Sequence, residues 1–323
     1  MKWQDDGYQS WDTQAWTQDF VAAAQEKDHE TLHVLRVTVY EHTLRLVDAG
    51  CMILNDGQEI ELPLRAELAQ ETVFYDDPPR VPASVARTGS MKVEVVVADT
   101  LEVAKSLVEV GLNPPVLNMT NRQNPGGGVI EGAGAKEEYL FRCSDYFRSL
   151  YQFTDYACEY QLEPHPIHRY PLNRETGGVY SPGVTIFRAS EATGYQLIEH
   201  PWHLSFVAVA VINRPCLVTS PDSHLKIDAP LVEPTKHKIR TIFRIAVAHG
   251  HRDLVLGALG CGAFCNPPAH MAKLFHEVLL EDEFLRCFDQ VVFAIRDDHS
   301  TYKWCNPEGN LLSFQREFAV ACR

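Results

Sequence analysis

One continuous stretch, residues 116–148, constrains the fold of this chain more than any other. It begins with the apolar pair Val116-Leu117 and Asn118, a pattern typical of the carboxyl end of a buried strand. A glycine-rich segment follows, and from Ala135 onward the residues are strong helix formers. This order of elements predicts an α/β fold, in which ligands collect at the carboxyl ends of the strands.

The glycine-rich segment lies between the predicted strand and helix. It contains Gly126, Gly127 and Gly128 in succession, with Gly132 and Gly134 soon after. Because glycine has no Cβ, an anion can approach the backbone N–H groups of such a loop closely. The segment therefore predicts a phosphate-binding loop, and the alternative is a surface loop without function.

Two common nucleotide-binding motifs do not fit this loop. Gly134-Ala135-Lys136 lacks the Gly-Lys-Ser/Thr sequence of a P-loop. Consecutive glycines also differ from the spaced glycines of the dinucleotide-binding fingerprint. Phosphate binding here requires a different geometry.

Two carboxylates, Glu137 and Glu138, fall in the first turn of the predicted helix. The helix dipole favours acidic residues there, so a solvated acidic pair is the structural alternative. The combination of a buried strand, a glycine loop and an acidic pair within one short run favours a functional site.

These residues resemble the signature of the bacterial-type poly(ADP-ribose) glycohydrolases, a branch of the macrodomain superfamily. The family has a Gly-Gly-Gly loop followed closely by Gln-Glu-Glu. Here the glycines are residues 126–128 and the acidic pair is Glu137-Glu138, while Lys136 replaces the usual Gln. The resemblance extends in order over roughly residues 92–296, most of the chain.

Two further segments carry the resemblance. Tyr180-Ser181-Pro182 precedes a predicted strand, and residues 254–268 look like the family's second ligand loop. The second loop follows an apolar run and precedes a helix that begins with prolines, so it offers another set of backbone N–H groups.

The resemblance implies a three-layer α/β/α macrodomain with a mixed central sheet, whose ligand is ADP-ribose. The diphosphate would lie between the two glycine loops, without a metal or other cofactor. The residues implied to contact the ligand are Asn118, Gly126, Gly127, Gly128, Gly260, Gly262, Ala263 and Phe264.

The implied activity is hydrolysis of ADP-ribosyl glycosidic bonds, which releases ADP-ribose from poly(ADP-ribose) or from ADP-ribosylated protein. Such hydrolysis needs an acid for the leaving oxygen and then a base for water, and one carboxylate can serve in turn. Glu138 matches the family's catalytic glutamate, and Glu137 matches the glutamate that would bind the ribose hydroxyls. Phe264 would contact the ribose or simply pack as a buried aromatic.

Two other functions remain open. A mono-ADP-ribosyl-protein hydrolase specific for one side-chain linkage is suggested by Lys136 and by Glu131, where the family tends to have a small residue. A non-catalytic ADP-ribose reader would keep the glycine loops and lose the acidic pair, whereas this chain has both.

A zinc site is the competing interpretation of the second loop. Cys261 and Cys265 lie near His249, His251 and His270 in the sequence. A C-x-x-x-C spacing with histidines scattered in this way is not a standard structural zinc site, so we expect no metal.

Composition limits the partners and the location. The net charge of −14 argues against binding of duplex nucleic acid, so the expected partners are poly(ADP-ribose) and ADP-ribosylated proteins. No apolar run is long enough for a membrane span, and the polar start does not resemble a signal peptide. With nine cysteines and no C-x-x-C pair, the chain is expected in the cytoplasm, with the nucleus as the alternative.

The chain divides at a proline-rich connection. Residues 1–89 are predicted to form an N-terminal extension packed on the core, with two amphipathic helices and a hairpin turning at Asn55-Asp56-Gly57. Residues 90–323 are predicted to form the catalytic domain. Its strands are expected at 92–98, 184–187, 204–212, 254–259 and 290–295, and its further helices at 101–110, 236–248 and 267–280.

Overall fold

The structure, a computed structural model, describes residues 10–85, 89–220, 224–297 and 301–319. The chain forms two compact units. The first unit comprises Met1–Val73, Gln123–Pro171 and Ser181–Leu204, and the second comprises Phe74–Arg122, Leu172–Tyr180 and Ser205–Arg323. The division of the chain into residues 1–89 and 90–323 stays a prediction.

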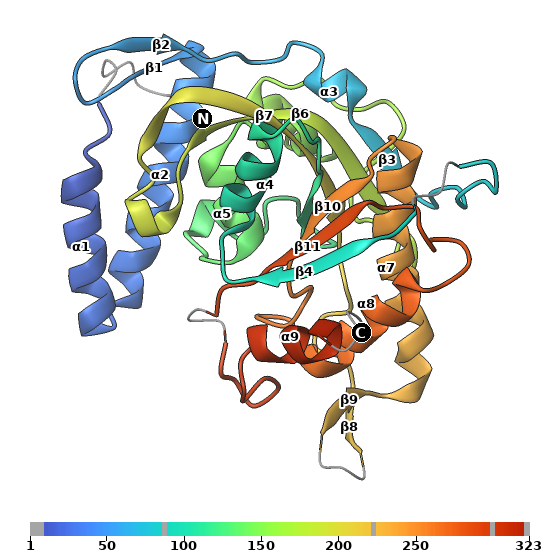
Figure 1. Cartoon of the computed structure of the whole chain (residues 1–323). Helices are drawn as coiled ribbons and strands as arrows, with labels where there is room; N and C mark the ends of the chain where they lie inside the picture. Colours follow the sequence, from blue (N-terminus) through green and yellow to red (C-terminus); the bar gives the residue numbers. More distant parts are fainter. Residues whose placement is uncertain (1–9, 86–88, 221–223, 298–300, 320–323) are drawn as a thin grey trace. The chain divides into compact units, whose positions relative to one another are not determined.

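A seven-stranded sheet is the central feature of the fold, with the strand order β3-β6-β7-β5-β10-β11-β4 (Figure 1). The pairs β7–β5, β5–β10, β10–β11 and β11–β4 are parallel. The strands are β3 (Val73–Tyr75), β4 (Lys92–Val96), β5 (Val116–Asn118), β6 (Gly178–Arg188), β7 (Leu197–Val209), β10 (Asp253–Leu256) and β11 (Gln290–Ala294). The sheet confirms the predicted α/β class with a mixed central sheet.

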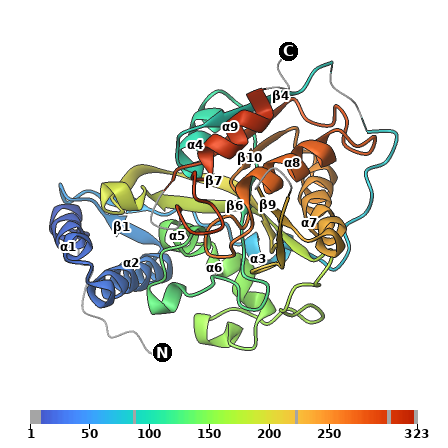
Figure 2. The same ribbon diagram turned by 90° about the horizontal axis from the view of Figure 1, so that it is seen from below.

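In the second unit, helices cover both faces of the parallel strands. Helix α4 packs against β5 and β10, whereas α9 packs against β4 and α8. Figures 1 and 2 show α4 on one face and α8 with α9 on the other. Right-handed crossovers that run in opposite directions along a sheet place their helices on opposite faces, as β4–α4–β5 and β10–α8–β11 do. The helices are α4 (Thr100–Glu109), α7 (Ala229–Ala248), α8 (Pro268–Leu279) and α9 (Leu311–Ala319).

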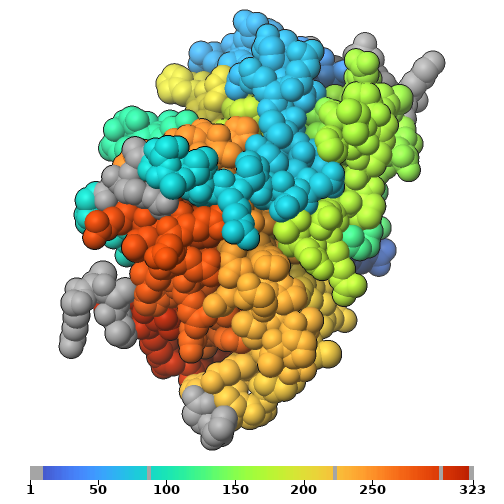
Figure 3. Space-filling model, turned by 90° about the vertical axis from the view of Figure 1, so that its right-hand side faces the viewer, coloured from blue at the N-terminus to red at the C-terminus, as the bar shows by residue number. Residues whose placement is uncertain are grey.

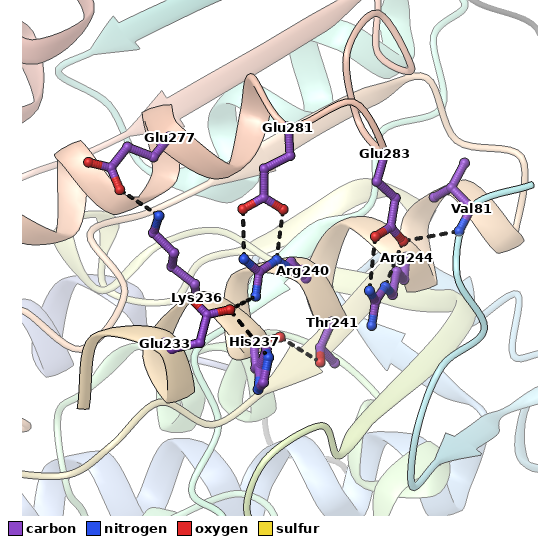
Figure 4. Close-up of polar contacts among 10 residues, drawn as sticks. All are labelled: Val81, Glu233, Lys236, His237, Arg240, Thr241, Arg244, Glu277, Glu281 and Glu283. Atoms are coloured by element: carbon purple, nitrogen blue, oxygen red, sulfur yellow. Dashed lines mark hydrogen bonds and ion pairs between the residues drawn. The ribbon is translucent and has the colours of Figure 1, made fainter. Parts of the chain in front are cut away.

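Charged side chains join α7 to the end of α8 and the turn that follows it (Figure 4). The spacing of four residues places successive cations of α7 on one face of the helix. Figure 3 shows the orange surface to which these segments contribute. The pairs are Lys236–Glu277 at 2.6 Å, Arg240–Glu281 at 2.7 Å and Arg244–Glu283 at 2.7 Å.

The first unit contains the N-terminal helices and the glycine loop. Helix α2 packs against both η1 and α5, so it supports the segment that the sequence singled out. The short helices around it are mostly single turns. The elements are α1 (Thr13–Glu26), α2 (His29–Ala49), β1 (Cys51–Ile53), β2 (Glu59–Glu61), α3 (Leu68–Glu71), η1 (Val129–Glu131), α5 (Lys136–Cys143), α6 (Phe147–Leu150), η2 (Tyr151–Phe153), η3 (Ala157–Tyr160) and η4 (Glu191–Thr193).

Local sequence signals account for several element boundaries. Gly50 ends α2 in the left-handed conformation, at φ 72°. Asp99 caps α4 and forms a capping box with Glu102. Strands β1 and β2 pair as the predicted hairpin, and Gly57 adopts φ 85° in its turn.

Other elements differ from the sequence prediction. Strand β6 begins at Gly178, so Tyr180-Ser181-Pro182 lie inside the strand and not before it. Glycine and proline normally interrupt strands, which is why the sequence predicted a shorter one. Helix α9 and the hairpin of β8 (Leu217–Thr219) and β9 (Leu225–Ile227) were not predicted.

Among the described residues, no helix is long and apolar enough to cross a membrane.

Two histidines next to the end of α7 contact a tyrosine within the second unit. The ring of Tyr180 stacks on His249 with 3.5 Å between centroids, and its hydroxyl lies 2.8 Å from His251 Nε2. Burial, together with the charge of the neighbouring His251, lowers the pKa of His249 from 6.5 to about 4. His249 is therefore neutral in the folded protein at neutral pH.

This pKa predicts a loss of stability in mild acid. As the pH falls below 6.5, the unfolded chain binds a proton at His249 before the folded chain does. The stabilisation is complete above pH 6.5 and is lost progressively down to about pH 4. We expect the urea midpoint of His249→Gln to fall less over this interval than that of the wild type. The matched control is His200→Gln, at an exposed histidine, and equal acid sensitivity of all three proteins would contradict the prediction.

Candidate active site

The acidic pair lies buried against the glycine loop in the first unit. Glu137 is 3% exposed and Glu138 is 6% exposed, so they are not a solvated pair. Glu137 Oε1 accepts the N–H of Gly126 at 2.9 Å, and Glu138 Oε1 accepts the N–H of Gly128 at 2.9 Å. The structure therefore brings the two parts of the sequence motif together.

Gly127 allows this close approach. Its φ is +55°, and a Cβ on this residue would lie 2.3 Å from Glu138 Oε1. Any other side chain would displace the carboxylate or the loop. The middle glycine is thus required for the position of Glu138.

The three loop N–H groups already have acceptors. Gly126 and Gly128 donate to the two glutamates, and Gly127 donates to the carbonyl of Asn124 at 3.1 Å. A phosphate group would have to compete with these acceptors. In this structure the glycines orient carboxylates, and their contact with a ligand stays a prediction.

One oxygen of the second glutamate is left available. Among the residues that the structure describes, Glu138 Oε2 is buried and has no hydrogen-bond partner. A buried carboxylate oxygen without a partner is costly, and such groups are commonly retained where they act on a ligand. This geometry suits a group that exchanges a proton with a bound molecule.

The loop geometry predicts the effect of Gly127→Ala. Alanine at positive φ costs about 1 kcal/mol, and the contact with Glu138 costs about 1–3 kcal/mol more. The control is Gly57→Ala, because Gly57 has φ +85° but nothing within 4 Å of a Cβ. Urea unfolding should show a larger loss of stability for Gly127→Ala. Equal losses would mean that the carboxylate moves aside freely.

The second loop lies between β10 and α8 in the second unit. Within the described part of the chain, the N–H groups of Gly262, Ala263 and Phe264 have no acceptor. The side chain of Asn266, which is fully buried, donates to the carbonyl of Gly260 at 3.2 Å and to that of Phe264 at 3.3 Å. The loop is therefore an ordered set of free donors in front of a helix N-terminus, which suits an anion.

Asn118 lies at the end of a strand, as the sequence predicted, and Phe264 lies in the second loop. Asn118 ends β5 and is fully buried. Because β5 pairs with β10 in parallel, Asn118 and the second loop follow neighbouring strands at the same edge of the sheet. Phe264 is partly exposed, so it is not simply a core residue.

The histidines near the second loop have other partners. The hydroxyl of Tyr180 is hydrogen-bonded to His251, and the hydroxyl of Tyr75 is hydrogen-bonded to His249. His270 Nδ1 accepts the N–H of Ile227 at 2.9 Å. Across the described ranges, His, Cys, Asp and Glu side chains form no group of three or more that could hold a metal ion. The geometry gives the zinc interpretation no support.

Sequence reasoning missed a polar cluster beneath the glycine loop. Arg36 of α2 pairs with Glu191 at 2.8 Å, and Arg142 of α5 donates to the carbonyl of Ala133 at 2.8 Å. Arg36 and Glu191 are 155 residues apart, so no local pattern connects them.

Comparison with known proteins agrees with this architecture. The model of the microbial-type PARG catalytic domain matches residues 40–189, a range that includes the glycine loop and the acidic pair. Comparison with curated protein sequences gave no match.

Several solved structures are similar to most of the chain. Poly(ADP-ribose) glycohydrolase from Thermomonospora curvata is 27% identical, with a TM-score of 0.67, and the match covers 88% of this chain and 99% of that one. A second structure of the T. curvata protein, bound to the inhibitor ADP-HPD, is 28% identical with a TM-score of 0.66, at the same coverage. The Deinococcus radiodurans enzyme in complex with ADP-ribose is 28% identical with a TM-score of 0.61, and the match covers 81% of this chain and 100% of that one.

The fold and the glycine loop with its two glutamates define a glycohydrolase-type α/β protein. Residues 40–189 match the microbial-type PARG catalytic domain, and most of the chain is similar in fold to bacterial poly(ADP-ribose) glycohydrolases.

Proposed function

We propose that this protein hydrolyses ADP-ribosyl glycosidic bonds and releases ADP-ribose from poly(ADP-ribose) or from ADP-ribosylated protein. The observation that carries the proposal is the burial and hydrogen bonding of the Glu138 carboxylate. It is buried, one oxygen is fixed by the N–H of Gly128, and the other has no partner among the described residues. This arrangement, in a chain similar to bacterial poly(ADP-ribose) glycohydrolases, fits a general acid and base.

The proposed chemistry depends on Glu138 Oε2, the oxygen without a partner among the described residues. Protonated Glu138 gives its proton to the leaving oxygen as the bond to C1″ breaks, and positive charge develops on the ribose. The ionised carboxylate then takes a proton from water, which attacks C1″ and completes hydrolysis. Glu137, held by the N–H of Gly126, binds the ribose hydroxyls and orients the sugar.

ADP-ribose is the proposed ligand. The free N–H groups of the second loop support binding of its diphosphate. The Deinococcus radiodurans enzyme is seen in complex with ADP-ribose and the Thermomonospora curvata enzyme with ADP-HPD. The proposed ligand-contacting residues are Asn118, Gly126, Gly127, Gly128, Gly260, Gly262, Ala263 and Phe264.

The composition of the chain supports proposals for its partners and its cellular compartment. The proposed macromolecular partners are ADP-ribosylated proteins, and duplex nucleic acid is disfavoured by the net charge of −14. Nine cysteines without a C-x-x-C pair support a reducing compartment, the cytoplasm or the nucleus.

One observation favours the narrower function of a mono-ADP-ribosyl-protein hydrolase. Glu131 is exposed, and its Oε2 would lie 3.8 Å from a Cβ on Gly128, so an extra negative charge stands beside the glycine loop. A polyanionic polymer is repelled more by this charge than a single ADP-ribosyl group is. The buried acidic pair counts against a reader without activity.

Substitution of Glu138 tests the proposed function. Glu138→Gln keeps the size of the side chain but cannot cycle a proton, so turnover should fall about a hundredfold or more. Affinity for ADP-ribose should change little, because the diphosphate is bound elsewhere. Glu137→Gln should lose less activity and bind more weakly. The control is Glu199→Gln, whose side chain is 60% exposed. Full activity in Glu138→Gln would show that another residue performs the chemistry.

Ligand binding should not need a metal, because backbone N–H groups take the place of a cation at the diphosphate. We expect calorimetry to give the same ADP-ribose affinity with and without EDTA. Loss of binding on chelation, restored by zinc or magnesium, would contradict this expectation.

A further inference from the structure

The polar cluster of the first unit lies behind the acidic pair and outside the sequence motif. Arg36, whose side chain is 8% exposed, donates two hydrogen bonds to Glu191. One comes from Nε at 2.8 Å and the other from Nη2 at 3.1 Å. A carboxylate that accepts both bonds fixes the plane of the guanidinium. Arg36 also lies outside the residues matched by the family model.

The guanidinium of Arg36 lies against the loop that begins α5. A Cβ on Gly134 would be 2.6 Å from Arg36 Cζ, so glycine is needed for this contact. One helical turn earlier in α2, the carbonyl of His33 would lie 2.1 Å from a Cβ on Gly132. Helix α2 therefore supports residues 132–135, which set the start of the helix that carries Glu138.

A second chain of hydrogen bonds connects α5 to the cluster. Arg142, fully buried, donates to the hydroxyl of Tyr195 at 2.7 Å and to the carbonyl of Ala133 at 2.8 Å. Tyr195 in turn donates to Glu191 at 3.1 Å. Arg36 thus binds Glu191 directly, whereas Arg142 is linked to Glu191 through Tyr195 and also binds the loop carbonyl of Ala133.

The cluster carries a surplus of positive charge. Arg36 pairs with Glu191, the charge of Arg142 also acts on Glu191, and the buried Arg188 donates to the carbonyl of Tyr195 at 3.0 Å. Burial by itself raises the pKa of Glu191, but the hydrogen bonds and charge of Arg36, with the charge of Arg142, bring it below its ordinary value. Burial raises the pKa of Tyr195, so this residue remains neutral.

Lys136, a cation near Glu138 in the sequence, has a different contact. The Lys136 ammonium lies over the ring of Tyr139, 4.3 Å from its centroid. Glu137 lies next to Glu138 in the chain, and Glu131 lies beside Gly128. Arg36 interacts electrostatically with Glu138, and Glu131 and Glu138 both lie within 4 Å of a Cβ on Gly128.

We propose that Arg36 is a positioning residue for Glu138, acting through the backbone of residues 132–135 and through its charge. The inference rests on the proposed function and adds to it a residue of α2 that supports the start of the helix carrying Glu138. Arg36 holds the start of α5 in place, and its charge interacts with the carboxylate of Glu138. It does not itself contact the reacting atoms.

The direct test is the titration of Glu138 in the full chain, followed by NMR of glutamate labelled with ¹³C at the carboxyl carbon. The Glu138→Gln variant assigns the resonance. Arg36→Met should raise the titration midpoint by about one pH unit, because an attractive charge is lost. Arg36→Lys keeps the charge and should stay near the wild type. Glu191→Gln removes the counter-charge and should lower the midpoint.

Opposite shifts in Arg36→Met and Glu191→Gln cannot come from a purely structural role. The control is Arg45→Met, at an exposed arginine of the same helix. An unchanged midpoint in folded Arg36→Met, or equal shifts in Arg36→Met and Arg36→Lys, overturns the proposal. If Arg36→Met does not fold, an unchanged midpoint in Glu191→Gln overturns it.

Turnover separates this inference from the proposed function. In an active protein, the limb of the pH–rate profile that reports Glu138 should move with the NMR midpoint in each variant. Shifted midpoints in a protein without turnover would leave the positioning role standing and reject the proposed hydrolase activity.

Discussion

The candidate active site depends on two hydrogen bonds from the glycine loop, Gly126 N–H to Glu137 and Gly128 N–H to Glu138. They hold two buried carboxylates side by side at the start of α5. Only a loop without side chains can approach the carboxylates this closely, since a Cβ on Gly127 would overlap Glu138. The consecutive glycines are therefore a steric requirement of the acidic pair, whatever they contribute to ligand binding.

Burying two neighbouring carboxylates is unfavourable unless donors and positive charge compensate. The loop N–H groups, the N-terminus of α5 and the cluster of Arg36, Glu191, Tyr195 and Arg142 provide this compensation locally. The net charge of the chain is −14, so it does not help. Helix α2 thus has a role in the chemistry as well as in packing, because it carries Arg36 and contacts the loop.

The sequence was most informative where the signal was local. The turn Asn55-Asp56-Gly57 predicted the hairpin, and the apolar runs predicted most of the longer helices and strands, because short-range chemistry determines these features. Long-range partners could not be predicted in the same way. The loop N–H groups were expected to await a phosphate, but tertiary packing gives them carboxylates. The pair Arg36–Glu191 joins residues 155 positions apart, which no periodicity reveals.

The central claim is that this protein cleaves ADP-ribosyl bonds. The most direct measurement is the release of ADP-ribose, quantified by mass spectrometry, from poly(ADP-ribose) and from proteins mono-ADP-ribosylated on Ser, Arg or Glu. We expect the wild-type protein to release free ADP-ribose from at least one of these substrates without added metal. Intact substrates in every reaction, with a protein that binds ADP-ribose tightly, would contradict the claim and identify the chain as a reader.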